Sequence, residues 1–341
     1  MPSPTILAVG TATPSSRFTQ EEILALSGYQ DPVRRGFFLN SGIAARHLAI
    51  DRETFWPDET VDALQERFRK AAPDLAARAA ARCLERAGRA PREVDFVATT
   101  TCTGRLCPSL DTLLIRDLGM RPDIQRVHVG DTGCAAAMVA FQQACNYLHA
   151  HPDHLALVVA AEVSSAAYYL DDAMETAVAN AIFADGAGAV LLARRGDGPQ
   201  VIATRTLLMP DGLDLMGFTY PGGRPRILLS KEIRHRAAEV LADWARAILE
   251  AHGLAREEVR HWVLHSAGHR ILEAAQRLLS LADTDLAFSR QVLRTYGNMS
   301  SATILFVLEA ALAAGRARPG DWGVMAALGP GFAAEGALLR W

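Results

Sequence analysis

Cys134 is the residue of this sequence that is best placed to act as a nucleophile. It follows Gly133 and precedes a run of alanines, so it lies where a loop turns into a helix. The positive end of a helix dipole stabilises a thiolate and can lower the pKa of the thiol well below about 8.5. A thiolate is the form of cysteine that attacks a thioester. The remaining cysteines lack this setting, and by residue pattern alone we expect inert, buried thiols at Cys83, Cys102 and Cys145.

His265 and Asn298 could bind the oxygen of a reacting carbonyl group. His265 ends an apolar segment and precedes small residues, which is a common place for functional groups in α/β proteins. Asn298 precedes a second apolar helical segment. Each residue also has an ordinary interpretation, because a buried His is often a hydrogen-bonded core residue and Asn caps helices well. With Cys134 they complete a Cys/His/Asn set suited to acyl transfer through an oxyanion.

The spacing of His261, His265 and His269 also raises the possibility of a metal site. Residues four apart share one face only on a helix, whereas this segment is typical of a strand and a turn. We therefore predict no metal ion here.

Short apolar strands alternate with helical segments along the chain, which is typical of an α/β protein. The pattern predicts strands over residues 6–10, 96–101, 155–162, 187–193, 201–204 and 262–265. It predicts helices over residues 75–86, 138–148 and 233–252. The segment 138–148 is apolar at almost every position, so we expect it to be buried on all sides.

The two halves of the chain share one order of elements, namely a glycine turn, a polar residue, a buried helix, a turn and a buried strand. The polar residue is Cys134 in the first half and Asn298 in the second. We predict a duplicated protein with halves 1–196 and 197–341, divided in the turn-forming segment 194–199. The repeated pattern places Cys134 and Asn298 at two helix N-termini that face each other.

The composition excludes several classes of protein. The 341 residues carry a net charge of −3, so no broad basic field predicts a nucleic-acid partner. The apolar runs are too short to span a bilayer and the N-terminal segment does not resemble a signal peptide, so we expect no membrane association. The glycines of ADGAGAV lack the spacing of a nucleotide-binding loop. Five cysteines without a CxxC pair favour a cytoplasmic location.

Several segments resemble the chalcone-synthase-like type III polyketide synthases. They are GDTGCAAAM, LHSAGHRIL and YGNMSSATILFVLE, followed by GPGFAAEGALLRW. The segment TCTGRLCPSL is similar to bacterial members of that family, and the similarity extends from TATP to the last residue. The resemblance implies a thiolase-like fold of αβαβα layers, a homodimer, CoA thioesters as substrates and no cofactor.

The resemblance also implies a reaction. Cys134 would accept a starter acyl group from CoA. His265 and Asn298 would hold the thioester carbonyl of malonyl-CoA, so that decarboxylation leaves a stabilised enolate. That enolate would attack the Cys134 thioester, and the cycle would repeat before the product cyclises.

Further positions match family residues with known places in the cavity. Phe183 and Tyr220 match two aromatic gatekeepers between the CoA tunnel and the cavity. The positions that match cavity-lining residues are Ser300, Cys102, Thr103 and Ala167. Cys107 matches the position that crosses the dimer interface into the partner's cavity.

The sequence departs from the family pattern in three places. Tyr220 stands where phenylalanine is usual and adds a hydroxyl group. The basic residues that would contact CoA do not keep the family register, and the candidates are Arg34, Arg35, Ala267 and Arg270. For Arg34 and Arg35, an ordinary solvated charge pair is an equal alternative. The loop over residues 164–176 is shorter than in plant enzymes, so the cavity shape does not transfer.

Two alternatives remain open at this point. A ketoacyl synthase III-like enzyme shares the fold and the Cys/His/Asn set, but it condenses once and uses an acyl carrier protein. YGNMSS, the GPG turn and Phe183 favour the iterative family. A catalytically silent partner subunit is the second alternative, and the intact Cys134, His265 and Asn298 argue against it.

Overall fold

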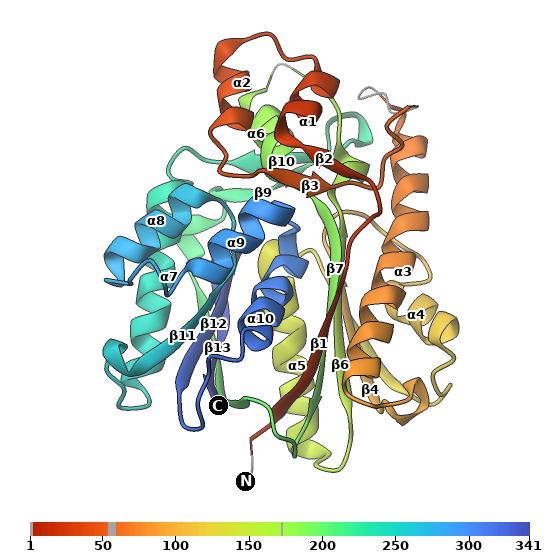
Figure 1. Ribbon diagram of the computed structural model, residues 1–341. Coiled ribbons are helices and arrows are strands. Elements are labelled where there is room, and N and C mark those ends of the chain that lie inside the picture. Colours follow the sequence, from red (N-terminus) through yellow and green to blue (C-terminus); the bar gives the residue numbers. More distant parts are fainter. Residues whose placement is uncertain (1–2, 54–58, 172) are drawn as a thin grey trace.

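The computed structural model of the protein describes residues 3–53, 59–171 and 173–341. Nine of the strands in this part of the chain form one continuous sheet (Figure 1). The strand order is β11-β12-β13-β8-β1-β7-β6-β4-β5. The strands of the first half are β1 (Thr5–Ala12), β4 (Phe96–Thr101), β5 (Gln125–Gly130), β6 (Ala156–Val163) and β7 (Asp185–Ala193). Those of the second half are β8 (Gln200–Leu208), β11 (Val259–Leu264), β12 (Trp322–Gly329) and β13 (Ala333–Arg340).

The two blocks of strands are joined by a single residue pair, Thr5 with Gln200, between β1 and β8. Within each block the pairing is long, as in β12 with β13 from Trp322–Arg340 to Gly329–Ala333. The predicted border at residues 194–199 falls in the connection between β7 and β8. The division into halves 1–196 and 197–341 remains a prediction.

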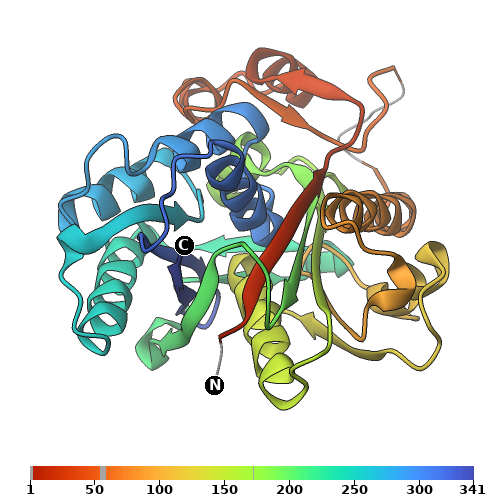
Figure 2. The same cartoon turned by 60° about the horizontal axis from the view of Figure 1, so that its bottom comes forward.

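The helices form layers on both sides of these strands (Figures 1 and 2). In the middle lie α5 (Ala136–Ala150) and α10 (Thr303–Ala313), each of which contacts strands of both blocks. The outer helix α3 (Val61–Arg86) covers β1, β6 and β7, and α7 (Ile233–Glu250) covers β8, β12 and β13. The outer layers also contain α4 (Leu110–Leu118), α8 (His269–Leu278) and α9 (Ala287–Tyr296). This gives the αβαβα order that we expected.

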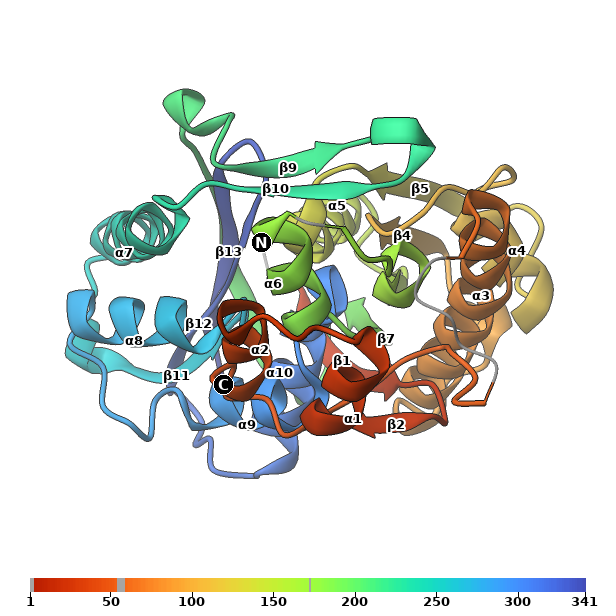
Figure 3. The same ribbon diagram turned by 90° about the horizontal axis from the view of Figure 1, so that it is seen from above.

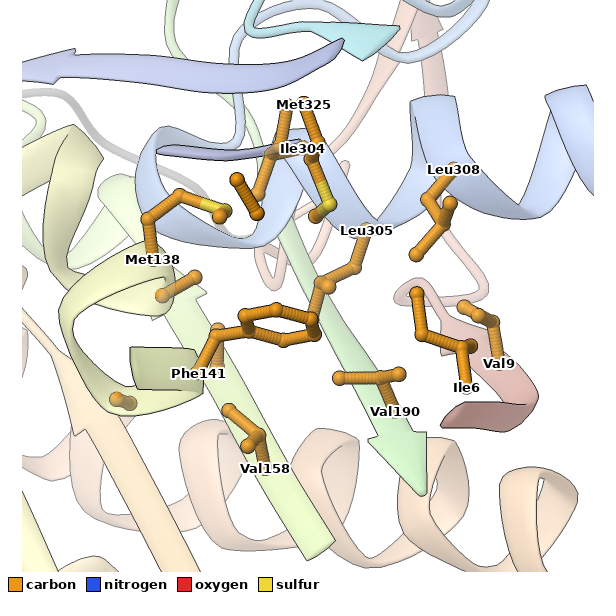
Figure 4. Close-up of a cluster of buried hydrophobic side chains, with 14 of the residues drawn as sticks. Ile6, Val9, Met138, Phe141, Val158, Val190, Ile304, Leu305, Leu308 and Met325 are labelled. Carbon is orange, nitrogen blue, oxygen red and sulfur yellow. The ribbon is translucent and has the colours of Figure 1, made fainter. Parts of the chain in front are cut away.

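The two central helices pack through a dry cluster of apolar side chains (Figure 4). Phe141 of α5 and Leu305 of α10 are 0% and 1% exposed, and they lie among strand residues such as Val158 and Val190. Burying a side chain of this size is worth roughly 1.5–3 kcal/mol. The cluster therefore fixes where both helices begin.

A cap of short elements covers one end of the layers (Figures 1 and 3). It contains β2 (Arg17–Thr19), α1 (Gln20–Ser27), α2 (Pro32–Leu39), β3 (Ala45–His47) and α6 (Met174–Ile182). Thr19 begins α1 with a capping box to Glu22, and Asp31 followed by proline begins α2. The hairpin of β9 (Met216–Thr219) and β10 (Arg226–Leu229) lies beside this cap.

Two expectations about helices were wrong. The helix expected over 75–86 begins at Val61 and continues through Pro73, because its packing against β1, β6 and β7 outweighs the hydrogen bond that proline removes. The helix expected over 138–148 spans Ala136–Ala150 and is not buried on all sides, since Gln143 and Asn146 are exposed. The strand β4 has the predicted bounds.

Candidate active site

Cys134 lies in a tight turn that only glycine can begin. A 3-10 turn, Gly133–Ala135, leads directly into α5. Gly133 has a φ of 59°, and a Cβ atom built there would lie 2.3 Å from Cδ of Pro330. The Gly329–Pro330 turn after β12 therefore packs directly on the turn that carries Cys134, and Cys134 is 8% exposed.

A matching turn from the second half faces Cys134. The 3-10 turn Ser300–Ala302 leads into α10 and contacts the turn of Cys134. The Ser300 Oγ lies 3.3 Å from the Sγ of Cys134 and 3.1 Å from the Sγ of Cys102. Ser300 has a φ of 48°, a left-handed conformation that is strained for serine. The expectation of two facing helix N-termini is confirmed, with Ser300 rather than Asn298 in direct contact with Cys134.

The Asn298 amide is held in one orientation. Its Oδ1 accepts a hydrogen bond from the Ser300 N–H at 2.9 Å, and its Nδ2 donates to the carbonyl oxygen of Ala267 at 3.2 Å. An amide NH₂ group has two hydrogens, so one of them is left to donate to a substrate. Asn298 is 2% exposed, which keeps water from competing for that hydrogen.

His265 lies on the same short segment as Ala267. It follows β11, its N–H donates to Ala326 on β12 at 2.9 Å, and its carbonyl oxygen accepts from the Ala267 N–H at 3.1 Å. The ring is buried, and neither ring nitrogen has a hydrogen-bond partner among the described residues. A buried imidazole without a partner is costly, which is typical of a group that awaits a substrate.

Burial controls the protonation of the His265 ring and of the Cys134 thiol. It lowers the pKa of His265 to about 4 and raises the pKa of the Cys134 thiol to about 12. The hydrogen bond with Ser300 acts in the opposite direction and lowers the pKa of Cys134. The lowered thiol pKa that the helix N-terminus predicts is therefore not found in the free protein, because removal from water outweighs it.

A cavity of about 340 Å³ opens beside Cys134. Apolar side chains form most of its wall, including Leu64, Phe68 and Ile227. The predicted residues that line it together with Cys134 are Phe183, Tyr220, Ser300, Cys102, Thr103 and Ala167. Cys102 was expected from residue pattern alone to be inert core, whereas the structure brings it to the cavity.

The two aromatic residues occupy different parts of the cavity. Phe183 is half-buried, and its backbone forms a bridge with Asn298. Tyr220 is 51% exposed in the β9–β10 connection, where the Arg105 guanidinium lies 5.9 Å from its ring centre. Tyr220 is therefore at the outer end of the cavity.

His265 and Asn298 are not among the residues that line this cavity, and Asn298 adjoins it through its bridge to Phe183 and its hydrogen bond with Ser300. The other predicted residues also lie outside the lining. Cys107 is exposed and lies in a separate surface groove with Arg69 and Arg116. Arg34 and Arg35 are on α2, where Arg34 lies 3.8 Å from Asp31 and Arg35 donates to the Tyr29 carbonyl. Ala267 and the exposed Arg270 flank the start of α8.

Sequence reasoning missed the buried carboxyl group of Glu162. It accepts hydrogen bonds from the Thr103 hydroxyl at 2.8 Å and from the Cys102 N–H at 3.0 Å, and it also contacts the Ser301 hydroxyl. Burial raises its pKa. The sequence does contain one signal for this residue, because Glu162 is a charged residue near the end of the otherwise apolar strand Ala156–Val163.

The described residues contain neither a metal centre nor a membrane-spanning helix. No group of three His, Cys, Asp or Glu side chains in that part of the chain could hold a metal ion. No helix within it is long and apolar enough to cross a membrane.

The layered fold and the two facing turns define a condensing enzyme of the thiolase-like class. Residues 39–201 match the family model for FAE1/Type III polyketide synthase-like proteins, and residues 224–341 match the C-terminal domain of chalcone and stilbene synthases. The chain is 35% identical to a 3,5-dihydroxyphenylacetyl-CoA synthase of Streptomyces toyocaensis, over 100% of this chain and 90% of that protein. It is 34% identical to a 1,3,6,8-tetrahydroxynaphthalene synthase of Streptomyces peucetius subsp. caesius, over 98% and 93%.

Solved structures agree with these matches. PKS-I from the brown alga Ectocarpus siliculosus superimposes with a TM-score of 0.93 at 30% identity, covering 100% of this chain and 98% of the other. The 1,3,6,8-tetrahydroxynaphthalene synthase of Streptomyces coelicolor A3(2) gives a TM-score of 0.93 at 26% identity, covering 99% of each. The chain belongs to the bacterial type III polyketide synthases of the chalcone and stilbene synthase family. The predicted fold, family and enzyme class are confirmed.

The first prediction concerns the turn of Cys134. Gly133→Ala should abolish reactivity of Cys134, because the new methyl group would collide with Pro330 and displace the turn. Reaction of the folded variant with iodoacetamide, followed by mass spectrometry, measures this. Gly119→Ala is the matched control, since Gly119 has a similar φ of 62° but no atom within 4 Å of the added Cβ. Equal Cys134 labelling in both variants would contradict the prediction.

Proposed function

We propose that the protein extends a CoA-linked starter on Cys134 by iterative decarboxylative condensation with malonyl-CoA, followed by cyclisation. The observation that carries this proposal is a pair of donors with free hydrogen-bonding capacity, Asn298 and His265, that are linked through backbone segments to Ser300, the residue in contact with Cys134. Asn298 keeps one free amide hydrogen, and both ring nitrogens of His265 lack partners among the described residues. Both residues are tied to the segment of Ala267.

Decarboxylation of the malonyl group requires donors that stabilise the negative charge of the resulting enolate. When the malonyl carboxylate leaves as CO₂, the electron pair of the broken C–C bond moves into an enolate whose charge rests on the thioester oxygen. Asn298 and a protonated nitrogen of His265 would donate hydrogen bonds to that oxygen. Donors fixed in a buried site stabilise such charge better than water does, because they need no reorganisation.

Condensation then uses the acyl group on Cys134. The enolate carbon attacks the carbonyl carbon of the Cys134 thioester, a C–C bond forms, the C–S bond breaks and the thiolate of Cys134 is released. The extended chain is then carried by CoA and can return to Cys134 for another round. The apolar cavity lined by Phe183 and Ala167 would hold the growing chain.

The substrates of this chain belong to the proposal. The family uses acyl-CoA substrates, and the names of two relatives describe a dihydroxyphenylacetyl-CoA synthase and a tetrahydroxynaphthalene synthase. We infer that malonyl-CoA is the extender and that an acyl-CoA supplies the starter. The proposed contacts to CoA are Arg34, Arg35, Ala267 and Arg270. A cytoplasmic location remains a prediction from the cysteine content.

Three substitutions test the assignment of the catalytic groups. Cys134→Ala should abolish product from malonyl-CoA with a panel of acyl-CoA starters. His265→Ala and Asn298→Ala should each slow malonyl-CoA decarboxylation about 100- to 1,000-fold, because each removes one oxyanion donor. Mass spectrometry of products and of acetyl-CoA measures both steps.

The outcomes of this screen separate the alternatives. Cys134-dependent products that carry two or more malonyl-derived units support the proposal. A single condensation, or activity only with an acyl carrier protein, refutes it in favour of a ketoacyl synthase III-like reaction. Complete inactivity with every starter would indicate a catalytically silent subunit.

A second prediction concerns the pH dependence of Cys134. Burial raises the thiol pKa to about 12 despite the hydrogen bond with Ser300, so the nucleophile needs a proton acceptor, and we assign this role to the neutral ring of His265. In His265→Ala, iodoacetamide labelling should rise about tenfold per pH unit from pH 6 to 9, because the thiolate fraction does so below the pKa. The wild type should label faster and with a shallower pH slope, since the neutral imidazole can accept the thiol proton as Cys134 reacts. Identical profiles for the two proteins would remove His265 from this role.

The homodimer is proposed from the open edge of the sheet. Among the described strands β5 pairs only with β4, so its outer edge presents unpaired backbone groups, and the strand is partly exposed. A second copy related by a two-fold axis could continue the sheet across this edge. It would also place the exposed Cys107 near the partner's cavity, as the family resemblance implies.

Light scattering coupled to size exclusion tests the dimer. The wild type should be a dimer, and Gly130→Lys on β5 should weaken it because it places a charge at the proposed interface. Gly130 is exposed and has no atom within 4 Å of an added Cβ, so the monomer has room for the new side chain. Arg260→Glu, on the other edge strand β11, is the control and should leave the mass unchanged. A monomeric wild type, or equal dissociation of both variants, would refute this assignment of the interface.

A further inference from the structure

The C-terminal end of α6 is closed by donors from three distant parts of the chain. The last carbonyl groups of a helix have no partner within it and must find one elsewhere. The Asn180 and Phe183 carbonyls accept from Nη1 of Arg46 at 2.8 and 2.6 Å. The Ala181 carbonyl accepts from Nε2 of Gln20 at 2.8 Å, and the Ile182 carbonyl accepts from the N–H of Asn298 at 2.9 Å.

Arg46 is an unusual donor for this purpose because it is completely buried. Its exposed fraction is 0%, and its Nε and Nη2 atoms have no hydrogen-bond partner among the described residues. Burial lowers the pKa of Arg46 to about 10, and the nearby Asp185 favours the charged form, so the side chain stays charged at neutral pH. A buried, incompletely paired guanidinium contributes poorly to stability. Its location therefore calls for an explanation other than stability.

The same side chain touches the segment of the catalytic amide. A Cβ atom built on Gly297 would lie 2.8 Å from Cγ of Arg46, so the methylene groups of Arg46 pack directly against the backbone that precedes Asn298. Gly297 has a φ of 75°, which glycine adopts readily. Arg46 thus contacts the end of α6 with its guanidinium and the Asn298 segment with its stem.

These two segments are themselves joined. Asn298 and Phe183 form an isolated bridge, in which the Asn298 N–H donates to Ile182 and the Ala184 N–H donates to the Asn298 carbonyl at 2.8 Å. A shift of Phe183 would therefore move Asn298, and the reverse. Because Arg46 holds both strands of this bridge, it determines where the cavity-lining ring and the amide donor lie relative to each other.

We propose that Arg46 is a positioning residue for the condensation reaction, which sets the Asn298 amide and the Phe183 ring by holding the end of α6 against the Gly297 turn. The proposal rests on the proposed function. Arg46 does not line the cavity and acts only through these two residues. Displacing a positioned group by about 1 Å can cost about 100-fold in rate, so small movements of Asn298 suffice.

Gln20 provides a matched control in the same helix end. It is 3% exposed and its amide caps the Ala181 carbonyl, which lies between the carbonyls that Arg46 caps. Its amide also donates to Ser41 and to the Phe38 carbonyl, and among the described residues it makes no hydrogen bond to Phe183 or the Gly297 segment. Gln20→Met removes one buried cap and should lower stability without moving the amide donor.

The experiment compares Arg46→Lys, Arg46→Met and Gln20→Met in malonyl-CoA decarboxylation, product distribution and thermal unfolding. Both Arg46 variants should lose 10- to 100-fold in kcat for decarboxylation with little change in KM, and their products should shift in length, because Asn298 and Phe183 move together. Gln20→Met should lower the unfolding temperature but keep kcat within about twofold and leave the products unchanged. Gly297→Ala, which keeps the guanidinium but pushes its stem, should reproduce the Arg46 phenotype if the Arg46 variants do not fold.

Each outcome has one meaning. Arg46 variants that unfold earlier but keep wild-type kcat and products overturn the inference, as does a Gln20→Met variant with the same kinetic loss. Normal kinetics in Gly297→Ala also overturn it. A wild type that forms no Cys134-dependent product refutes the proposed function itself, and the inference with it.

Discussion

The site depends on one packing constraint, which is that the first turns of α5 and α10 meet in the buried layer between the two blocks of strands. Phe141 and Leu305 belong to the apolar cluster that joins them (Figure 4). Since both helices are held along their length, their first turns must meet, and those turns carry Cys134 and Ser300. The contact is so close that neither Gly133 nor Gly329 has room for a side chain beside it. The close approach of Cys134 and Ser300 is therefore a consequence of core packing.

Burial at this junction has two opposite effects on the reactive groups. It holds Cys134 and His265 away from water, which favours the neutral form of both. It also makes each remaining hydrogen bond more valuable, because no water competes for the Asn298 amide or the His265 ring. The result is a site that carries little charge when empty and gains its full set of interactions when a thioester and its developing oxyanion are present. This arrangement suits an enzyme that must stabilise an enolate.

The outer parts of the molecule are arranged around that junction in different ways. The end of α6 is fixed by buried polar groups from the cap, whereas the mouth of the cavity is formed by the β9–β10 hairpin and the first turns of α3. Tyr220 in the hairpin is half exposed, while Phe183 at the end of α6 is anchored through its backbone. Phe183, close to Asn298, is thus held by hydrogen bonds, whereas Tyr220 at the entrance has a surface contact with Arg105.

The sequence by itself determined the class of fold and the pairing of two glycine turns with two apolar helices, and it predicts the Cys134, His265 and Asn298 set. These features are local, because a glycine turn, an apolar helix and a strand end each leave a pattern within about ten residues. The tertiary structure alone decided the rest. It decided that Ser300 contacts both Cys134 and Cys102 and that α3 passes through Pro73. It also brought Arg46 to Phe183 and Glu162 to Thr103, contacts between residues far apart in the chain. Such contacts depend on how layers stack and on which polar groups must be satisfied once buried, and neither quantity can be read from a local pattern.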